Sequence, residues 1–355
     1  MTGPDILIVS LATTEGWRTN ELELAAGLQR LGVDHRIERA EMGPSRHLRR
    51  TMPMVDAVEA AAARRALKRG LAGGLPRAIV FMGSTAALHA SVARLQDQGI
   101  RIAIRLDCPA AVNRPQAASA AHRRLERRRL ADADVVLAMG PRSAATVEDL
   151  ARRTIVLPTP IEAPTGKPTY PPTAISYVAD PDKKGLELVA RSWPLVREQF
   201  PEMRLLLAGL DTARGVAYLA HKGAPLTAGL EWLGMVPRAD YLAVLAEASV
   251  YVSASHREDH GITQLEALAA GVPLATTSAT GAYEAEPIVE AIDARLIAND
   301  RSPHAVAAAV RRAMSYSVEQ RERFRAGTQT HTRSMSRPAV DRLLEELVLP
   351  VLLES

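Results

Sequence analysis

The stretch of sequence that decides the fold is Ser253–Pro273, SASHREDHGITQLEALAAGVP. It follows the apolar run Val250–Val252, whose β-branched and aromatic residues are typical of a buried strand. A polar loop then leads into a helical pattern that begins at about Gly261. A phosphate fits there, because the first turn of a helix has free N–H groups and a positive end, and because glycine allows close approach. The stretch therefore predicts a strand, a loop and a helix that together form an anion site.

Short apolar runs alternate with helical patterns along the whole chain, which predicts βαβ units and parallel sheets. A first series places strands near 5–11, 35–39, 77–82, 100–106 and 134–139, and helices near 19–31, 55–70, 86–98, 116–131 and 141–152. A second series places strands near 174–178, 203–209, 229–233, 249–254, 272–277 and 294–298. We therefore expect an α/β protein with two Rossmann-like β/α/β domains that face a central cleft at the carboxyl ends of both sheets.

Proline-rich sequence separates the two series. Residues 158–173 carry six prolines, which continue neither a helix nor a central strand, and we interpret this segment as a linker. The N-terminal domain would then be residues 1–157 and the C-terminal domain residues 174–335. Apolar residues recur at helical spacing in 336–355, which predicts a closing helix that packs back on the N-terminal domain.

The composition excludes several classes of protein. With 47% hydrophobic and 24% charged residues in 355 positions, the chain is too apolar to be disordered. No apolar run approaches the ~20 residues of a membrane-spanning helix, and Asp5 stands where a signal peptide has a base. The single cysteine, Cys108, cannot form an internal disulfide, and no Cys/His cluster has zinc spacing. We therefore expect a globular protein of the cytoplasm.

Basic residues are concentrated in the first half of the chain. Residues 1–165 contain 24 basic and 17 acidic side chains, against 20 and 23 in the remainder. The excess comes from the run His122–Arg129 and from Arg46, Arg49, Arg50, Arg64, Arg65, Lys68 and Arg69. One interpretation is a solvated face, and the other is contact with an anionic acceptor or with acidic lipids at the inner membrane face. Nucleic acid is not expected, because only 4% of residues are aromatic.

Two glutamates flank the predicted anion site. Glu266 lies about one turn inside the helix, so its carboxylate would accept two hydrogen bonds from a vicinal diol such as that of a ribose. Glu258 lies in the loop and would reach a hydroxylated group on the other side of the phosphates. The alternative is that both acids only favour the positive end of the helix.

The order of strand, Glu258, Gly261, Glu266 and Ala-Ala-Gly-Val-Pro resembles the E-x7-E signature of retaining GT-B glycosyltransferases, family 4 in particular. Asp182–Gly185 resembles the family's Lys-Gly element, in which the lysine contacts the donor diphosphate, and Lys184 matches that lysine.

Other segments fall where the family places them. Glu231–Pro237 resembles the strand and turn that recognise the nucleotide base, which would place Met235 and Val236 beside the base. Gly209 matches the glycine after the second strand of the donor domain, and Thr280–Glu284 resembles the family's Gly-x-x-Glu element.

The sequence also departs from the family. Val178 stands where the family usually has an arginine that contacts the diphosphate, and we expect Lys183 to compensate. His260 replaces a common phenylalanine, which indicates a more polar pocket for the donor sugar, although a lone histidine more often makes only local hydrogen bonds.

The first half resembles the family only in architecture. Gly16 follows the first strand where the family often has paired glycines, and it is either a phosphate or sugar contact or a plain loop glycine. Asp107 ends a strand close to where relatives have a histidine that contacts the donor sugar; a cap or turn aspartate is the alternative. The G-x-G-x-x-G fingerprint of dinucleotide enzymes is absent.

The resemblance implies a hexosyltransferase that moves a hexose-like unit from a nucleotide-diphosphate sugar, with UDP or GDP as the expected nucleotide, to a hydroxyl acceptor with retention. Lys184 and the N–H groups at Gly261 and Ile262 would stabilise the leaving diphosphate, and no Asp-x-Asp metal motif is present. Two alternatives stay open, which are a nucleotide-sugar epimerase of the same architecture and a non-catalytic sugar-nucleotide-binding protein. The second is motivated by Val178 and by the missing histidine near Asp107.

Overall fold

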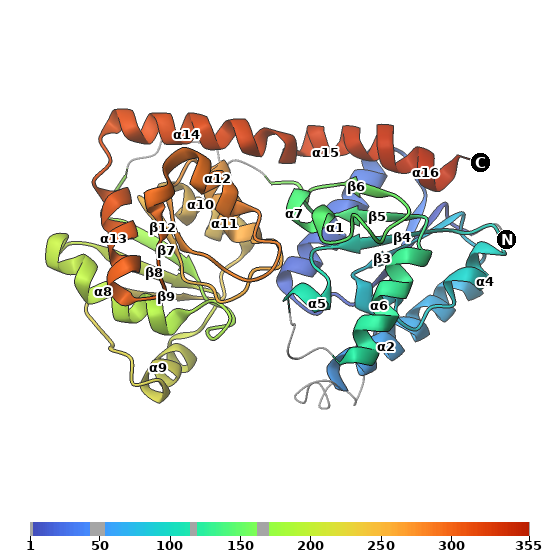
Figure 1. Cartoon of the computed structure of the whole chain (residues 1–355), viewed down its shortest axis with the longest axis horizontal. Helices are drawn as coiled ribbons and strands as arrows, with labels where there is room; N and C mark the ends of the chain where they lie inside the picture. The colour runs from blue at the N-terminus through green and yellow to red at the C-terminus, as the bar shows by residue number, and fades with distance from the viewer. Residues whose placement is uncertain (1–2, 43–53, 114–118, 162–169, 355) are drawn as a thin grey trace. The chain divides into compact units, whose positions relative to one another are not determined.

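The computed structural model describes residues 3–42, 54–113, 119–161 and 170–354 (Figure 1). The chain divides into two compact units, each built on a six-stranded parallel sheet. The first unit consists of residues 1–160 and 335–355, and the second of residues 161–334. The fold is therefore α/β with two Rossmann-like domains, as the alternating pattern predicts.

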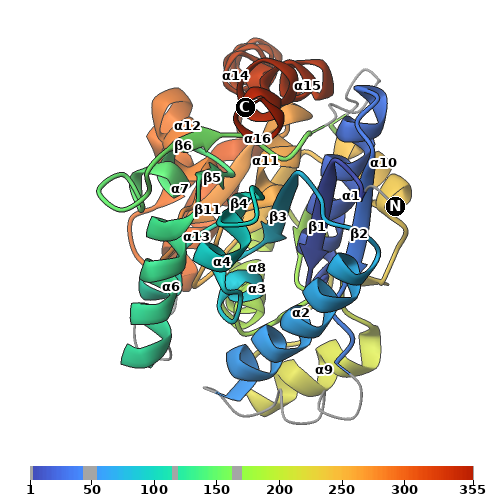
Figure 2. The ribbon, with the colours of Figure 1, turned by 90° about the vertical axis from the view of Figure 1, so that its right-hand side faces the viewer.

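The sheet of the first unit has the strand order β2-β1-β3-β4-β5-β6. Its strands are β1 (Ile6–Ser10), β2 (His35–Arg39), β3 (Ala78–Met82), β4 (Arg101–Leu106), β5 (Val135–Ala138) and β6 (Thr154–Val156). The residues of β1 alternate between two cores: Leu7 and Val9 contact one side and Ile6 and Ile8 the other. Helices cover both faces of the sheet (Figure 2), which is why its central strands are apolar throughout.

The helices of the first unit are α1 (Glu15–Arg30), α2 (Met54–Ala72), α3 (Ser84–Ala87), α4 (Val92–Gln96), α5 (Ala110–Asn113), α6 (Ala120–Asp132) and α7 (Pro141–Ala145). The predicted helix 19–31 starts earlier than expected, because Thr14 caps it by accepting a hydrogen bond from the Trp17 N–H. The single helix predicted over 86–98 is wrong, because the chain turns after α3 and buries Ala90 in the same core as Val92.

The end of the first sheet also differs from the prediction. The helix predicted over 141–152 ends at Ala145, and turns lead from there into β6, a strand that the pattern did not indicate. Thr154–Val156 is only three residues long, too short to show an alternating pattern. Residues 116–118 of the predicted helix 116–131 and residues 162–169 of the predicted linker lie outside the described residues.

The closing segment contains α15 (Arg337–Leu343), a π-helical turn η4 (Leu344–Val348) and α16 (Leu349–Leu353). Four of its side chains, Val340, Leu344, Val348 and Leu352, are buried in one core with residues of α1 and β1. Gly27 of α1 makes the close approach possible, since a Cβ there would lie 2.7 Å from Leu344 Cδ1. Arg30 adds two hydrogen bonds of 2.7 Å to the Asp341 carboxylate.

The sheet of the second unit has the strand order β12-β11-β10-β7-β8-β9. Its strands are β7 (Thr173–Tyr177), β8 (Arg204–Ala208), β9 (Leu230–Gly234), β10 (Val250–Ser253), β11 (Leu274–Thr277) and β12 (Ile297–Ala298). Counted along the unit, the order is third, second, first, fourth, fifth, sixth, and it reverses between β7 and β10. In sheets of this kind, ligands bind at the carboxyl ends of the strands where the order reverses.

The helices of the second unit are α8 (Leu186–Gln199), α9 (Thr212–His221), α10 (Arg238–Glu247), α11 (Ile262–Ala269), α12 (Ala285–Asp293), α13 (Pro303–Met314) and α14 (Val318–Thr332), with 3₁₀ turns at η2 (Ala294–Leu296) and η3 (Arg333–Met335). The strand predicted over 294–298 is confined to two residues, because Asp293 caps the turn η2 through the Arg295 N–H. None of the helices in the described part of the chain has the length and apolar character of a membrane span.

The burial of the closing segment leads to a stability prediction. Leu344 is 1% exposed and Leu347, three residues on, is 43% exposed. We expect Leu344→Ala to lower the free energy of unfolding by about 2 to 5 kcal/mol, because it leaves a cavity against α1. Leu347→Ala is the matched control and should change it by less than about 0.5 kcal/mol. Urea unfolding of both variants measures this, and equal losses would contradict the packing described.

Candidate functional site

Two loops meet at the point where the order of the second sheet reverses. The loop 178–185 connects β7 to α8, and the loop 254–261 connects β10 to α11. They are tied by backbone contact, since the His256 N–H donates to the Lys183 carbonyl over 2.9 Å. Gly185 has a positive φ of 67°, and a Cβ there would clash with the Ala254 carbonyl oxygen. Glycine is therefore required for the start of α8 to approach the second loop.

A buried ion pair joins the two loops. The Lys184 ammonium lies 2.6 Å from Glu258 Oε1, and Glu258 is 2% exposed. The same carboxylate accepts hydrogen bonds from Ser255 Oγ at 2.6 Å and Gln264 Nε2 at 2.7 Å. Burial raises the pKa of Glu258, but the ammonium groups of Lys184 and Lys183 and these hydrogen bonds outweigh it and hold the pKa below its usual value. Glu258 is therefore an ionised and fixed carboxylate.

Lys183 is paired in the same way with the next acidic residue of the loop. Its ammonium lies 2.7 Å from Asp259 Oδ2. Burial lowers the pKa of Lys183, and the negative charges of Asp259 and Glu258 raise it by more, so the lysine stays cationic. The two predicted diphosphate contacts thus lie together at the carboxyl ends of the strands, each beside a carboxylate.

Gly261 occupies the N-terminal position of α11 with a φ of 85° and no side chain that caps the helix. A Cβ there would lie 3.0 Å from the ring of Tyr283, so a larger residue would be both strained and crowded. The N–H groups of the first turn, including that of Ile262, have no intrahelical acceptor. The predicted anion site has the helix start that it requires.

Glu266 is the second predicted carboxylate, and its surroundings differ from those of Glu258. It is 1% exposed, and Arg238 Nη2 lies 2.5 Å from its Oε1. Neither carboxylate oxygen has a hydrogen bond of good geometry to the described residues. Burial raises the pKa of Glu266 to about 7, although Arg238 opposes the rise. Its capacity to accept hydrogen bonds is largely unused within the protein.

The remaining donor-side predictions concern the neighbouring strands. Gly209 follows β8 and donates its N–H to the Gly234 carbonyl over 2.8 Å, which joins the ends of β8 and β9. Met235 follows β9 and is 66% exposed, and Val236 is partly buried. The position of Met235 suits a contact with a planar base, which stays a prediction.

The two positions at which the sequence departs from the family pattern are buried. Val178 is fully buried and donates its N–H to the Ala208 carbonyl over 2.8 Å, so it has no part in an anion site. His260 is 4% exposed, and its carbonyl accepts from the Glu284 N–H at 3.3 Å, which ties the segment 280–284 to the loop. A contact between His260 and a sugar stays a prediction.

Asp107 and Gly16 belong to the first unit. Asp107 Oδ1 accepts a hydrogen bond from the Cys108 N–H at 2.6 Å, as a turn aspartate does. Gly16 is exposed in the first turn of α1, and the positive φ in this region, 45°, occurs at Ala12 instead. Gly16 is therefore not the loop glycine that the sequence indicated, because the Thr14 cap draws it into the helix. Substrate roles for both residues stay predictions.

The structure adds residues that the sequence analysis missed. Arg301 donates to the Ala254 carbonyl at 2.6 Å and to the Ser255 carbonyl at 2.9 Å, so it fixes the loop that carries Glu258. Arg238 supplies the counter-charge of Glu266. Neither arginine lies in the quoted stretch, whereas Ser255 and Gln264 do and could have been singled out as polar residues around Glu258.

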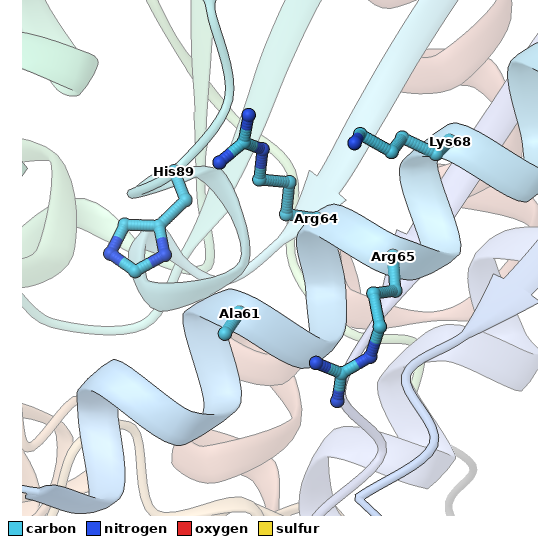
Figure 3. A pocket seen from close by; sticks show the side chains of 5 residues that line it. All are labelled: Ala61, Arg64, Arg65, Lys68 and His89. Carbon is cyan, nitrogen blue, oxygen red and sulfur yellow. The ribbon is translucent and has the colours of Figure 1, made fainter.

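Some of the basic residues of the first unit lie around a hollow in its surface. A cavity of about 260 Å³ is lined by Ala61, Arg64, Arg65 and Lys68 of α2 and by His89 (Figure 3). Arg64 and Lys68 have no carboxylate partner within the described residues. Partial burial and the charges of Arg64 and Arg129 lower the pKa of His89. The predicted basic residues Arg46, Arg49 and Arg50 lie outside the described residues.

The run His122–Arg129 has an inner and an outer face. Glu126 is buried and accepts hydrogen bonds from Ser84 Oγ at 2.5 Å and the Ala110 N–H at 3.0 Å. Arg129 donates to the Leu88 carbonyl at 3.1 Å, and Arg127 is exposed. Within the residues that the structure describes, no group of three or more His, Cys, Asp or Glu side chains is placed to hold a metal ion.

The fold is of the GT-B type, with two Rossmann-like domains, and the candidate anion site lies at the switch point of the second. Residues 159–331, just under half of the chain, match the family described as glycosyl transferases group 1. The paired Lys184 and Glu258 fall within the residues that match.

Individual proteins also resemble the chain. A phosphatidyl-myo-inositol mannosyltransferase of Propionibacterium freudenreichii subsp. shermanii is 31% identical over 96 residues, which are 27% of this chain and 22% of the relative. The chain thus aligns with about a fifth of that protein's length. Among solved structures, sucrose-phosphate synthase from Thermosynechococcus elongatus has a TM-score of 0.77 at 18% identity and covers 99% of this chain and 100% of its own.

A further structural neighbour is the trehalose-6-phosphate protein from E. coli bound with UDP-2-fluoro glucose, with a TM-score of 0.70 at 14% identity and 99% of both chains covered. At these identities the structures establish the fold. The comparisons therefore confirm the predicted fold class.

The raised pKa of Glu266 gives a pH-dependent stability prediction. The folded pKa of about 7 lies above the ordinary 4.5, so the stabilisation from the protonated carboxyl is complete below pH 4.5 and is lost as the pH rises through 7. Glu266→Gln stays neutral at every pH and should therefore be more stable than the wild type at pH 8, by up to about 3 kcal/mol.

The difference should shrink as the pH falls toward 5. Thermal melts of wild type, Glu266→Gln and the exposed control Glu290→Gln at pH 5 and pH 8 measure it. A gap between wild type and Glu266→Gln that does not change with pH would contradict the assignment.

Proposed function

We propose that the protein is a retaining glycosyltransferase of the family 4 type, which moves a hexose-like unit from a nucleotide-diphosphate sugar to a hydroxyl acceptor. The observation that carries the proposal is the combination, at one switch point, of the Lys184–Glu258 pair with a second buried carboxylate, Glu266, and an uncapped helix start at Gly261. A mannosyltransferase among the relatives and a neighbour bound with UDP-2-fluoro glucose support it.

Stabilisation of the leaving group would supply most of the catalysis. The bond between the anomeric carbon and the diphosphate oxygen breaks, its electron pair stays on the diphosphate, and the acceptor oxygen bonds to the same face of the carbon. The acceptor proton leaves with the nucleoside diphosphate. The charge that develops is met by Lys184, with Lys183 beside it, and by the N–H groups of Gly261 and Ile262. Such fixed, partly buried charges are effective because they need no reorganisation, and we therefore propose that no metal ion takes part.

Glu258 and Glu266 would bind different parts of the donor. Glu258 is ionised and fixed by three partners, so it is suited to orient the hydroxyl groups of the donor sugar. Glu266 has unused acceptor capacity, which matches the two donors of a ribose diol. The base would lie beside Met235 and Val236, beyond the Gly209 turn, and His260 would make the sugar pocket more polar. We expect UDP or GDP as the nucleotide.

The acceptor would bind mainly to the first unit, with Asp107 and Gly16 as the residues nearest the chemistry. We propose that the acceptor carries an anionic group. Arg64 and Lys68 place two positive charges beside the hollow, which His89 also lines, and neither forms an ion pair with a carboxylate of the described residues. An anionic lipid at the cytoplasmic membrane face is one source of such a group and a free phosphorylated sugar is the other. We expect no nucleic-acid partner.

Substitution of the two carboxylates separates their roles. Glu258→Gln should lower kcat by about a hundredfold or more with little change in donor KM, because it removes a group that orients the reacting sugar. Glu266→Ala should mainly raise donor KM, by roughly tenfold, because it removes hydrogen bonds to the ribose. Initial rates with UDP- and GDP-sugars measure both, and Glu290→Gln is the exposed control. Unchanged constants in both variants would refute the assignments.

The acceptor proposal is measured in the same assay. Phosphorylated and neutral sugar acceptors are compared, and anionic vesicles are added in a separate sedimentation arm. Arg64→Ala with Lys68→Ala should raise the KM for a charged acceptor and leave donor KM unchanged, whereas Arg127→Ala, an exposed arginine outside the hollow, should do neither. Sedimentation with vesicles that depends on Arg64 and Lys68 would identify the lipid source. Equal acceptor KM values in all variants would exclude the hollow as acceptor site.

Incubation with donor alone separates the reaction from the alternatives. A transferase releases nucleotide slowly by hydrolysis and does not change the configuration of the sugar in the intact donor. Interconversion of donor sugars without acceptor would instead identify an epimerase. Binding without hydrolysis or transfer would identify a non-catalytic sugar-nucleotide-binding protein.

A further inference from the structure

Within the described part of the chain, Arg238 forms an ion pair with the buried Glu266 carboxylate. It is the first residue of α10, and its side chain is 40% exposed, whereas that of Glu266 is 1% exposed. The pair therefore joins a solvent-accessible cation to an inaccessible anion. Arg238 can return to water at little cost, but Glu266 cannot.

Two features make Arg238 a poor permanent partner. Arginine stabilises a carboxylate best through two parallel hydrogen bonds, yet here the contact joins Nη2 to Oε1 and neither oxygen has a hydrogen bond of good geometry. A cation at the first residue of a helix is also repelled by the positive helix end. Pro237 precedes the helix without a side-chain cap, and Asp240 in the first turn is the acidic residue that partly offsets this repulsion.

We propose that Arg238 is a displaceable counter-ion of the donor site, which occupies Glu266 until the ribose diol of the nucleotide takes its place. The inference rests on the proposed function, because it assumes that Glu266 binds a ribose. In this arrangement the guanidinium compensates the buried charge, and the two hydroxyl groups compete with it for the same oxygens. Arg238 is thus a specificity-determining residue, because it reduces the preference of the site for a ribonucleotide over its 2′,3′-dideoxy counterpart.

The competition has a signature that other roles do not share. A nucleotide with both hydroxyl groups must displace Arg238, whereas its 2′,3′-dideoxy counterpart leaves the ion pair in place. Removal of the arginine should therefore strengthen binding of the first and leave binding of the second unchanged. If Arg238 instead contacted the diphosphate, its removal would weaken both nucleotides by the same factor.

Isothermal titration calorimetry at pH 9, where Glu266 is ionised, tests the proposal by measuring the Kd of each nucleotide. UDP, GDP and their 2′,3′-dideoxy counterparts are titrated into the full chain as wild type and Arg238→Ala. We expect Arg238→Ala to lower the Kd of the nucleotide that binds by about tenfold, the equivalent of one hydrogen bond to a charged group, and to change the dideoxy Kd by less than about twofold. Arg238→Lys keeps the charge without the fork and should be intermediate.

Arg204→Ala is the matched control, since Arg204 forms an exposed ion pair with Glu231 at the amino end of β8. An unchanged ratio between ribose and dideoxy affinities in Arg238→Ala and Arg238→Lys would overturn the proposal, as would an equal loss for both nucleotides. If neither UDP nor GDP binds the wild type, the proposed function itself fails. The two failures are therefore distinguishable.

Discussion

The buried ion pair between Lys184 and Glu258 is the constraint on which the second unit depends. A carboxylate that is 2% exposed is costly unless a cation and hydrogen bonds compensate it, and removal of one partner of such a pair typically costs several kcal/mol. The pair therefore fixes the loop after β7 against the loop after β10. Gly185 permits the close approach of the two loops, and Arg301 donates hydrogen bonds to the carbonyl groups of Ala254 and Ser255.

That constraint places the start of α11 beside two lysines. Once the loops are fixed, the N–H groups after Gly261 and the charges of Lys183 and Lys184 lie at the carboxyl ends of the strands. All of these groups would stabilise an anion bound there. The two glutamates of the segment then have opposite environments. Compensation keeps the pKa of Glu258 low, and burial raises that of Glu266, so one segment supplies two carboxylates with opposite pKa shifts.

The sequence alone predicts much of this arrangement. Each predicted strand overlaps an observed one, because strands buried on both faces are short apolar runs between helical patterns. Glu258 and Gly261 were predicted from the order of strand, loop and helix, and Lys184 from the resemblance of Asp182–Gly185 to a family element. Arg238 and Arg301 were not, because they contact the site from segments that share no motif with it. The break between α3 and α4 and the short strand β6 depend on tertiary packing, and the early start of α1 depends on the Thr14 cap.

The proposed function requires that the second unit binds a nucleoside diphosphate through Glu266 and the helix start at Gly261. The most direct measurement is the shift in melting temperature of wild type and Glu266→Ala with UDP, GDP, ADP and dTDP. A ligand at a hundred times its Kd adds about 2.7 kcal/mol to the stability of the folded state, which moves the melting temperature by several degrees. We expect one nucleotide to raise the melting temperature of the wild type and not that of Glu266→Ala. A wild type that none of the four shifts, or equal shifts in both proteins, would contradict it.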